Sequence, residues 1–586
     1  MRFHPVHLAL AFSVFHSYAK SSSVSTADHA LELITRSGGE HGHHHGVAPL
    51  LELNETELLQ HGHSPTPPSY YTIDWEDPEQ TPGSRHPSLI ITHSVFMSLA
   101  FFGFLPTAIT LRTLNHAWRG VAVFGFYASF ILACAASSVY RKLTPDMYAG
   151  SSHARYGYTV LLVALVLTGI DTFDAFCRLV LFLRSEKHYT FKGIVRALFG
   201  RDQNHEGQPL NVEYIGLMGD EEDAPKEGKQ SRDSYDVPDS IHTSRSSSPH
   251  SEATLHDVHI SSSRGLISCG ISLLRRVGRG AFAVTERALV IAGFAMLLSG
   301  IVIYTGGCRE KYFTGCLAHL IKGGIFWCYG LISFARFLGW CSEVGWAWNR
   351  ATPSHAGYPT AEMVESTVIF LYGATNTWME RFGAEPGDPY TTKQIQHIGI
   401  AVMFWFAGLV GMAIESKTIR RWLTVYSDRP ENILESHTPS FNPFPALVIG
   451  VTGSVMAAHF QVYLFQVQIH ALWGNLLVAF AVLRSLTYFF LWVAPPRTTL
   501  PSRPPTEALG SFFLAAGGLS FMFSTEEVTI MAMRRGRDDI MMFAVVAVAI
   551  TCLAFSWTVW VVGFHGWLKG HMKRNGRSIS YDTHSA

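Results

Sequence analysis

Histidines in or beside apolar segments are the residues of this sequence best placed to do chemistry. His93 lies inside the apolar stretch LIITHSVFMSLAFFGFLP (residues 89–106), and His153 directly precedes another such stretch. Histidine is uncommon in membrane helices and tends to mark a site when it occurs there. Neutral imidazoles from neighbouring helices can ligate a haem iron, and an imidazole can also bind a metal cation or exchange a proton. For any single histidine, an interfacial ring that is hydrogen-bonded to headgroups or water is the better explanation, whereas for the pair His93 and His153 the two explanations are balanced.

Later apolar stretches carry a second group of histidines and several other polar residues. We expect His459 to lie deeper in its stretch than the other three histidines do. Unpaired polar groups cost several kcal/mol each in lipid, so these side chains should face one another. They form either an ion or small-ligand site or polar contacts between helices. The residues concerned are His319, His397, His459, His470, Glu365, Asn376, Glu380 and Glu415.

Shorter patterns predict metal binding, a disulfide and modification sites. The tract HGHHHG contains His43, His44 and His45, which are weak candidate metal ligands in what is otherwise a solvated tail. Cys308 and Cys316 bracket a short loop and are either a disulfide or two unpaired thiols. The remaining candidates are the glycosylation sequon at Asn54 and phosphorylation at Ser234 and Ser248.

The elements that must position these residues are membrane helices. The chain has 586 residues, of which 48% are hydrophobic and only 15% are charged, against about 25% charged in an average soluble protein. A spanning helix needs about 20 mostly apolar residues. By that measure we predict eleven spans, at residues 89–111, 117–138, 156–182, 287–305, 316–340, 362–379, 394–414, 444–467, 470–494, 507–525 and 540–564.

The fold class predicted is therefore all-α: a polytopic helical membrane protein with two bundles separated by a disordered insert. We divide the chain into a signal peptide (1–19), a lumenal His-rich disordered tail (20–87) and a three-helix membrane region (88–184). A disordered Ser-rich cytosolic insert (185–285), a C-terminal membrane region of about eight helices (286–568) and a cytosolic tail (569–586) follow. The formal net charge is zero, so no global basic signature for nucleic acid exists.

Orientation follows from the signal peptide. A short apolar core ending in Ser17-Tyr18-Ala19 is typical of a secretory signal, which places the tail in the lumen or outside the cell. We therefore expect a membrane of the secretory pathway: endoplasmic reticulum, Golgi, vacuole or plasma membrane. The loops that this count puts in the cytosol carry much of the Lys and Arg, as the positive-inside rule predicts. The exception is MRRGRDD near residue 535, which is rich in Arg but which this count puts outside.

The N-terminal membrane region resembles the core of the ascorbate-type transmembrane cytochromes b. The resemblance lies in THSVFMSLAFFGFLPTAITLR, NHAWRGVAVFGFYASFILACAASSVY and SSHARYGYTVLLVALVL. It implies haem b, with His93, His116 and His153 as ligands, Gly157 completing an H-x-x-x-G element, and an electron donor on the lumenal side. His93 and His153 would share one haem. His116 would need a partner in ERALVIAGFAMLLSGIVIY, which has no histidine, so a second haem is in doubt.

The whole chain resembles the Ytp-type fungal multi-pass membrane proteins. These join a short cytochrome-like N-terminal region to a longer C-terminal membrane region. The stretches that carry the resemblance include GGCREKYFTGCLAHLIKGGIFWCYGLISFARFLGWCSEVGWAWN, VESTVIFLYGATNTWMERFG, QHIGIAVMFWFAGLVGMAIES and GSVMAAHFQVYLFQVQIHALWG.

Three functions follow as hypotheses. The first is a b-haem redox protein that uses His93 and His153. The second is a metal-ion or proton transporter, although no span carries H-x-x-x-D and no helix carries H-E-x-x-H. The third is a non-catalytic membrane scaffold regulated through the Ser-rich insert. A soluble hydrolase or a nucleic-acid-binding protein is excluded, because no nucleophile–base pattern is readable and the ionisable residues are scattered. The sequence does not determine the oligomeric state.

Overall fold

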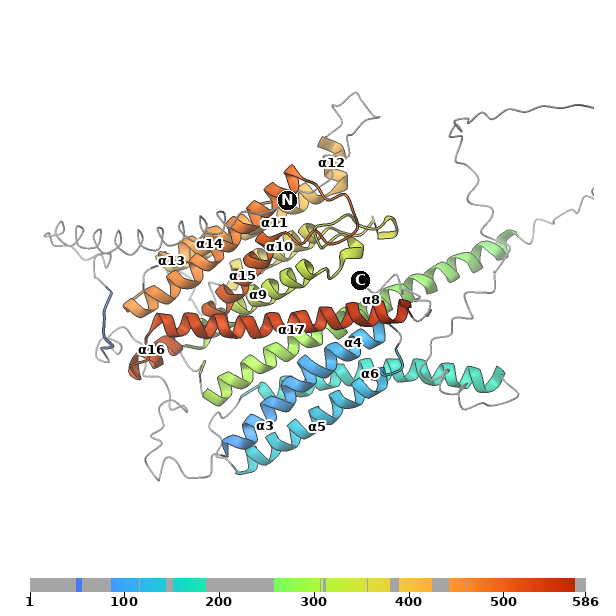
Figure 1. The fold of residues 1–586 in the computed structure, drawn as a ribbon, viewed down its shortest axis with the longest axis horizontal. Helices are drawn as coiled ribbons and strands as arrows, with labels where there is room; N and C mark the ends of the chain where they lie inside the picture. The colour runs from blue at the N-terminus through green and yellow to red at the C-terminus, as the bar shows by residue number, and fades with distance from the viewer. Residues whose placement is uncertain are drawn as a thin grey trace, which may run out of the picture. The chain divides into compact units, whose positions relative to one another are not determined.

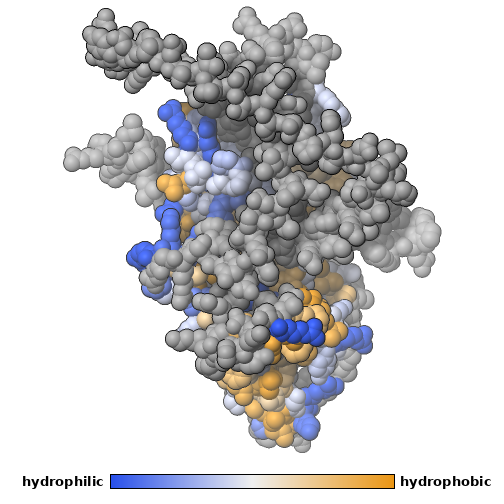
Figure 2. Space-filling model, turned by 90° about the vertical axis from the view of Figure 1, so that its right-hand side faces the viewer, coloured by the Kyte–Doolittle hydropathy of each residue, from blue (hydrophilic) through white to orange (hydrophobic). Residues whose placement is uncertain are grey.

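The structure, a computed structural model, describes residues 49–54, 86–114, 116–143, 151–185, 258–305, 307–308, 312–355, 357–379, 389–423, 442–459 and 461–574. Within these residues, nine helices are long and apolar enough to cross a membrane. Their outward faces carry exposed large apolar side chains, and Figure 2 shows such hydrophobic surface in orange beside hydrophilic residues in blue. The predicted polytopic all-helical fold is confirmed.

All eleven predicted spans contain a helix, and two of them fall short of the spanning criterion. One is residues 362–379, whose helix has polar residues among its apolar ones. The other is residues 444–467, where the helix ends at Ala457 after 14 residues and the next helix begins at Leu464. His459 therefore lies in the connection between two helices, and the prediction that it lies deep in a span is wrong.

The chain forms two compact units, which are described separately. The N-terminal unit, residues 83–300 and 564–586, contains α3 (Pro87–Ser98), η2 (Leu99–Phe104), α4 (Leu105–Thr113), α5 (Arg119–Leu143), α6 (His153–Ser185) and most of α8 (Val258–Thr305). We expected the disordered insert to extend to residue 285, whereas α8 already begins at Val258.

A π-helical turn, η2, interrupts the first span of the N-terminal unit. Pro106 follows this turn, and because proline has no N–H and its ring clashes with the preceding turn, a regular α-helix cannot run through it. The turn directs two rings into notches on other helices: Phe101 lies against Gly293 of α8, and Phe104 lies against Gly125 of α5. The core of this unit is built around these rings.

The C-terminal unit, residues 1–82 and 301–563, holds the larger bundle. Its elements are α9 (Phe313–Leu338), α10 (Ala361–Met379), α11 (Thr392–Glu415), α12 (Lys417–Leu423), α13 (Phe444–Ala457), α14 (Leu464–Val493), α15 (Pro505–Phe523), α16 (Glu526–Arg534) and most of α17 (Ile540–Arg574). The most extensive pairings are α9 with α15, α10 with α11, α13 with α14, and α14 with α15, and Figure 1 shows these helices running side by side. The expected cytosolic tail began at residue 569, whereas α17 continues to Arg574.

A short piece of the N-terminal tail pairs with the C-terminal unit. The Leu50 amide donates to the Val462 carbonyl oxygen at 2.9 Å, and the Leu464 amide donates to the Leu50 carbonyl oxygen at 2.9 Å. Leu50 and Leu53 pack against the buried side chains of Tyr312, Tyr463 and Ile530. The tail was expected to be disordered from residue 20 to residue 87, so residues 49–54 depart from that expectation.

Glycines allow α9 and α15 to approach until their backbones touch. A methyl group at Gly518 would lie 2.5 Å from the backbone nitrogen of Trp327 and 2.6 Å from the carbonyl oxygen of Gly323. Small residues at helix contacts are the usual means of close packing in membranes, where no hydrophobic force drives helices together.

Replacing Gly518 by alanine should therefore destabilise the bundle by about 1–3 kcal/mol, because α9 and α15 must separate to fit the methyl group. Thermal unfolding in detergent measures the effect. Gly563→Ala is the matched control, since nothing lies within 4 Å of a methyl group there. Equal melting temperatures for the two variants would contradict the close-packing argument.

Candidate functional site

Five ionisable side chains come together in the C-terminal unit, and we call them the charge cluster: Arg336 (α9), Glu362 and Glu365 (α10), Arg484 (α14) and Glu507 (α15). Relative exposure is 2% for Arg336, 1% for Arg484 and 0% for Glu507. Four helices thus contribute to one buried set of charges. Such groups are rare within membrane helices because each is costly to take out of water.

Arg336 lies near the end of α9 and holds both glutamates of α10. Its guanidinium pairs with Glu365 and lies 3.3 Å from a carboxylate oxygen of Glu362. Its Nε donates to the carbonyl oxygen of Trp346 at 2.8 Å. Glu362 and Glu365 are three residues apart, so they lie on the same face of α10 and can reach one guanidinium together.

Arg484 connects three helices to α14. Its Nη1 lies 3.4 Å from both carboxylate oxygens of Glu365 in α10, and its Nη2 donates to Ser333 Oγ of α9 at 3.1 Å. Its Nε is 2.7 Å from Glu507 Oε1 in α15. The Nε–Glu507 pair lacks the angle of a hydrogen bond, so charge attraction holds it.

A loop with unusual backbone geometry covers the charge cluster at the end of α9. The ring of Trp348 lies 4.4 Å from the Arg336 guanidinium carbon and 5.6 Å from that of Arg484. Trp348 has φ = 51°, a left-handed conformation that is strained for a large side chain. Asn349 holds the loop by donating to the carbonyl oxygens of Ser342 and Thr499, each at 2.7 Å. Strained residues of this kind cluster at functional sites.

The cluster has three carboxylates and only two guanidiniums. With every group ionised it would carry one uncompensated negative charge in a buried site, which costs several kcal/mol. Glu362 also interacts electrostatically with Glu415, whose carboxylate accepts a hydrogen bond from Thr360 at 2.7 Å. The arrangement can therefore take up one proton or one monovalent cation.

The four predicted histidines of this unit form two pairs. The ring centroids of His319 and His470 are 6.1 Å apart, and those of His397 and His459 are 6.0 Å apart. His459 Nδ1 donates to the side-chain oxygen of Gln396 at 3.0 Å. The two pairs and the charge cluster are separate sites, so the expectation of one joint network of histidines and acids is not met.

In the N-terminal unit, one hydrogen bond at Nδ1 fixes the ring of His93 and another fixes the ring of His153. His93 Nδ1 donates to the carbonyl oxygen of Ala133 at 2.9 Å. His153 Nδ1 lies 2.8 Å from Ser299 Oγ, whose own proton goes to the carbonyl oxygen of Met296, so the histidine is the donor. The two rings interact electrostatically. In both histidines Nε2 is left as the nitrogen with a lone pair, which is how ligand histidines are held.

His116 does not join this pair. It lies in the connection between α4 and α5, where its Nδ1 accepts a hydrogen bond from the Trp118 amide at 3.3 Å. From His93 to the end of α4 the chain rises roughly 30 Å at 1.5 Å per residue. His93 and His153 fit one haem as a donor set, and His116 belongs to the other end of the span.

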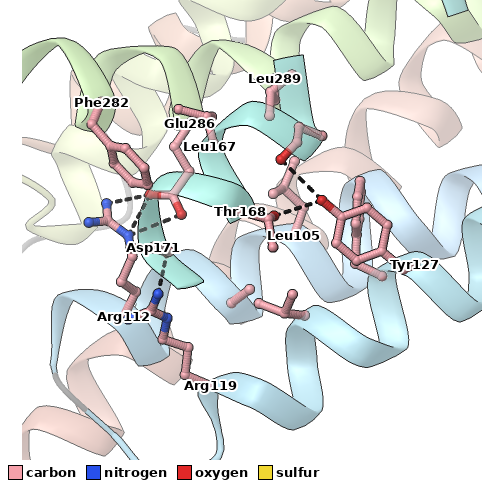
Figure 3. Close-up of a pocket in the computed structure, with 14 residues that line it drawn as sticks. Leu105, Arg112, Arg119, Tyr127, Leu167, Thr168, Asp171, Phe282, Glu286 and Leu289 are labelled. Carbon is pink, nitrogen blue, oxygen red and sulfur yellow. Dashed lines mark hydrogen bonds and ion pairs between the residues drawn. The ribbon is translucent and has the colours of Figure 1, made fainter. Parts of the chain in front are cut away.

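A small cavity of about 40 Å³ lies near the end of α4 in the N-terminal unit (Figure 3). Arg112 Nε lies 2.9 and 3.1 Å from the carboxylate oxygens of Glu286, and Arg119 pairs with Asp171. The Tyr127 hydroxyl donates to the Ala164 carbonyl oxygen at 3.0 Å and accepts from Thr168 Oγ1 at 2.6 Å. The space suits a water molecule or two. Each charge here has one opposite partner, so these pairs hold α4, α5, α6 and α8 together.

Cys308 and Cys316 are joined by a disulfide in the structure. Glu527 is close to them: its carboxylate and the two sulfurs lie within 4.8 Å of one another, and its Oε2 accepts a hydrogen bond from the Cys308 amide at 2.7 Å. With both sulfurs in the S–S bond, these three residues do not make a three-ligand metal site.

The remaining predicted residues lie at the edge of the described part of the chain or outside it. Asn54 is exposed at the end of the paired tail piece, and its glycosylation stays a prediction. Outside the described residues lie the signal peptide, His43, His44, His45, Ser234, Ser248 and Glu380.

Of the five cluster residues, only Glu365 was predicted from the sequence; Arg336, Arg484, Glu362 and Glu507 were not. A signal was present, because FARFLG and VLRSLTYF each place one arginine inside an apolar stretch. An arginine at such a position is among the costliest residues in a membrane helix and therefore implies a partner.

Comparison with known proteins decides the family. The chain is 32% identical to "Uncharacterized membrane protein C3B8.06" of Schizosaccharomyces pombe over 79% of its own length and 91% of that protein. Residues 292–566 match the family described as "Protein YTP1-like, C-terminal". The chain belongs to the YTP1-like family. Residues 76–171 match a domain of unknown function, DUF2427.

Other YTP1-like relatives align over shorter parts. "Uncharacterized membrane protein YCR061W" of Saccharomyces cerevisiae is 36% identical over 43% of this chain and 42% of its own length. "Protein YTP1" of the same organism is 25% identical over 50% of this chain and 56% of its own length. No solved structure matches. The whole charge cluster falls within the YTP1-like C-terminal region, and His93 and His153 fall within the other matched domain.

Removing Arg484 should be strongly destabilising. Arg484→Met leaves Glu365 and Glu507 buried without their shared cation, and breaking a buried ion pair on one side costs about 3–5 kcal/mol. Thermal unfolding in detergent measures this loss. The double variant R484M/E507Q should recover part of it, since the second change removes one stranded charge.

Arg537→Met is the control, because Arg537 is exposed and should matter by no more than about 0.5 kcal/mol. If R484M unfolds at the same temperature as R537M, the cluster does not hold the bundle together.

Proposed function

We propose that this multi-pass membrane protein of the YTP1-like family is a proton-translocating carrier whose C-terminal unit does the transport. One observation carries the proposal: three carboxylates and two guanidiniums, with side chains at most 13% exposed, meet where α9, α10, α14 and α15 pack together, which leaves one charge to be neutralised. Ionisable groups in such positions mark ion pathways and proton relays more often than they mark stability.

Of the three carboxylates, Glu362 has the weakest pairing with a guanidinium, so protonation of Glu362 stabilises the cluster most. Its contact with Arg336 is 3.3 Å, whereas Glu365 is shared by both arginines and Glu507 lies 2.7 Å from Arg484. Glu362 also interacts with Glu415, whose negative charge is partly offset by Arg420 at 3.6 Å. A proton on Glu362 leaves two carboxylates against two guanidiniums, which makes the cluster neutral.

The loop that carries Trp348 gives this protonation step a structural consequence. With the proton bound, the neutral cluster favours the closed arrangement in which Trp348 covers both guanidiniums. With the proton lost, the buried negative charge favours water entry and an open loop. A ligand shifts an equilibrium only by binding its two states differently, and the proton does so here through the charge of the cluster.

We place the protein in a membrane of the secretory pathway, with the tail that contains Asn54 on the lumenal side. This placement rests on the signal-peptide pattern at the N-terminus and on the glycosylation sequon at Asn54.

Glu362→Gln mimics the protonated acid and tests the proposal. Purified protein in liposomes with a trapped pH dye and an inside-negative potential should take up protons, and E362Q should lower that rate at least about tenfold while leaving the melting temperature unchanged or higher. Asp538→Asn, an exposed carboxylate, should behave as wild type.

Two results would overturn the proposal. One is a wild-type rate equal to that of protein-free liposomes. The other is an E362Q variant that unfolds at lower temperature with an unchanged rate, which would make the cluster a structural element and favour the scaffold function.

The N-terminal unit favours a second candidate function, a b-haem redox protein. Its support is that His93 and His153 both have Nδ1 bonded, so that Nε2 is the nitrogen available to an iron. These two residues would hold the haem, which supplies one-electron transfer when bound. An electron donor would then act at the end of the unit where these histidines lie.

An absorbance spectrum of protein purified after expression with added haem tests this function. We expect a Soret band and a sharp α-band on reduction, both lost in His93→Ala and in His153→Ala because either change removes an axial ligand. His355→Ala is the control, since its ring bonds only locally, to Thr352 and Ser354. A flat spectrum for the wild type would remove the redox function.

A further inference from the structure

Two helices of the C-terminal unit, α9 and α14, carry two polar levels in register. Ser333 follows His319 by 14 residues on α9, and Arg484 follows His470 by 14 residues on α14. Because Ser333 bonds Arg484 and His319 faces His470, the two helices run parallel. The antiparallel α15 brings Phe521 to the histidine level, where its ring centroid is 5.1 Å from that of His319.

The two histidine side chains meet at a separation that one metal ion can bridge. Their ring centroids are 6.1 Å apart with planes at 85°. Two imidazoles that share an ion at a Zn–N distance of about 2.0–2.1 Å have centroids roughly 5–6.5 Å apart. His470 is buried, at 4% exposure, and His319 is half-buried.

Backbone hydrogen bonds fix the same tautomer in both rings. His319 Nδ1 donates to the carbonyl oxygen of Gly315, and His470 Nδ1 donates to that of Gln466, each at 2.8 Å. A carbonyl oxygen can only accept, so Nδ1 carries the proton and Nε2 keeps its lone pair in each ring. Ligand histidines in metalloproteins are held by this kind of bond, which orients the ring and raises its basicity.

A buried carboxylate at this end of the bundle favours a cation. Glu527 is 5% exposed and lies on α16, and Thr529 of the same helix accepts a hydrogen bond from Gln466, the residue one turn before His470. A carboxylate in this part of the bundle adds negative potential, which suits a cation rather than an anion.

We propose that His319 and His470 bind one transition-metal cation of the Zn²⁺ class through their Nε2 atoms, with water in the remaining positions. Imidazole is a preferred ligand of Zn²⁺, Cu²⁺ and Ni²⁺. A site with only two protein ligands binds its ion exchangeably, as a carrier requires. This inference rests on the proposed function and deepens it by naming a cation that the carrier would move against protons.

The site and the charge cluster lie at opposite ends of the same helices. Fourteen residues at 1.5 Å each separate the two levels by about 21 Å. Between them lies a hydrophobic core that includes Phe326, Trp473, Leu477, Phe480 and Leu514. The cation and the proton would therefore occupy separate sites on shared helices.

Zn²⁺ titrated into detergent-purified full-length protein tests the site. The tail histidines at 41, 43–45, 61 and 63 are replaced by glutamine so that the tail does not mask the measurement. By calorimetry, this background should bind one Zn²⁺ more tightly than its H319A and H470A variants by at least about tenfold. H355A should bind as the background does.

A second readout covers the case in which H470A, whose side chain is buried, folds poorly. Zn²⁺ should raise the melting temperature of the background and not that of H319A, because a ligand that binds only the folded state stabilises it. Unchanged affinity in H319A and H470A would overturn the proposal. So would a loss of binding confined to H397A/H459A, which removes the other histidine pair.

The binding measurement involves no transport, so the two proposals can fail separately. Zn²⁺ binding without proton flux would reject the carrier and keep the metal site. Proton flux without Zn²⁺ binding at His319 and His470 would reject the metal site and keep the carrier.

Discussion

The attraction between two guanidiniums and three carboxylates is the interaction on which the C-terminal unit depends. Arg336 and Arg484 together engage α9, α10, α14 and α15, so four helices are fixed by two side chains. In lipid the helices gain nothing by hiding apolar surface from one another, and polar contacts and close packing must hold them. The rest of the bundle, including the glycine contacts of α9 with α15, is arranged so that these charges can meet.

Burial strengthens these ion pairs and also raises the free-energy cost of leaving any of the charges unpaired. In a low dielectric each paired charge is held firmly, and each unpaired one is expensive. A structural device would match the charges one to one, as Arg112 with Glu286 and Arg119 with Asp171 do in the N-terminal unit. The excess carboxylate of the charge cluster breaks that rule, and the strained Trp348 lies directly over it. These two departures are what separate the cluster from ordinary helix contacts.

Much of the fold could be predicted from the sequence, because long apolar runs identify membrane helices without knowledge of their partners. The prediction failed at residues 444–467, where apolar residues continue through the connection that contains His459 and that pairs with Leu50. The charge cluster was harder to predict from the sequence. Glu365 was recognised as a polar residue in a span, but its partners Arg336 and Arg484 lie 29 residues before it and 119 residues after it. Which helices lie side by side is decided by contacts such as Gly323 with Gly518, and no local pattern encodes them.

The equal spacing on the parallel helices α9 and α14 has a mechanical consequence. A rigid displacement of α14 along α9 that moves Arg484 past Ser333 must move His470 past His319 by the same step. The two ends are thus coupled by the stiffness of two helices, without a relay of side chains between them. Thermodynamic linkage then requires reciprocity. If a cation at His319 and His470 changes the proton affinity of the charge cluster, a proton on the cluster changes the cation affinity by the same factor.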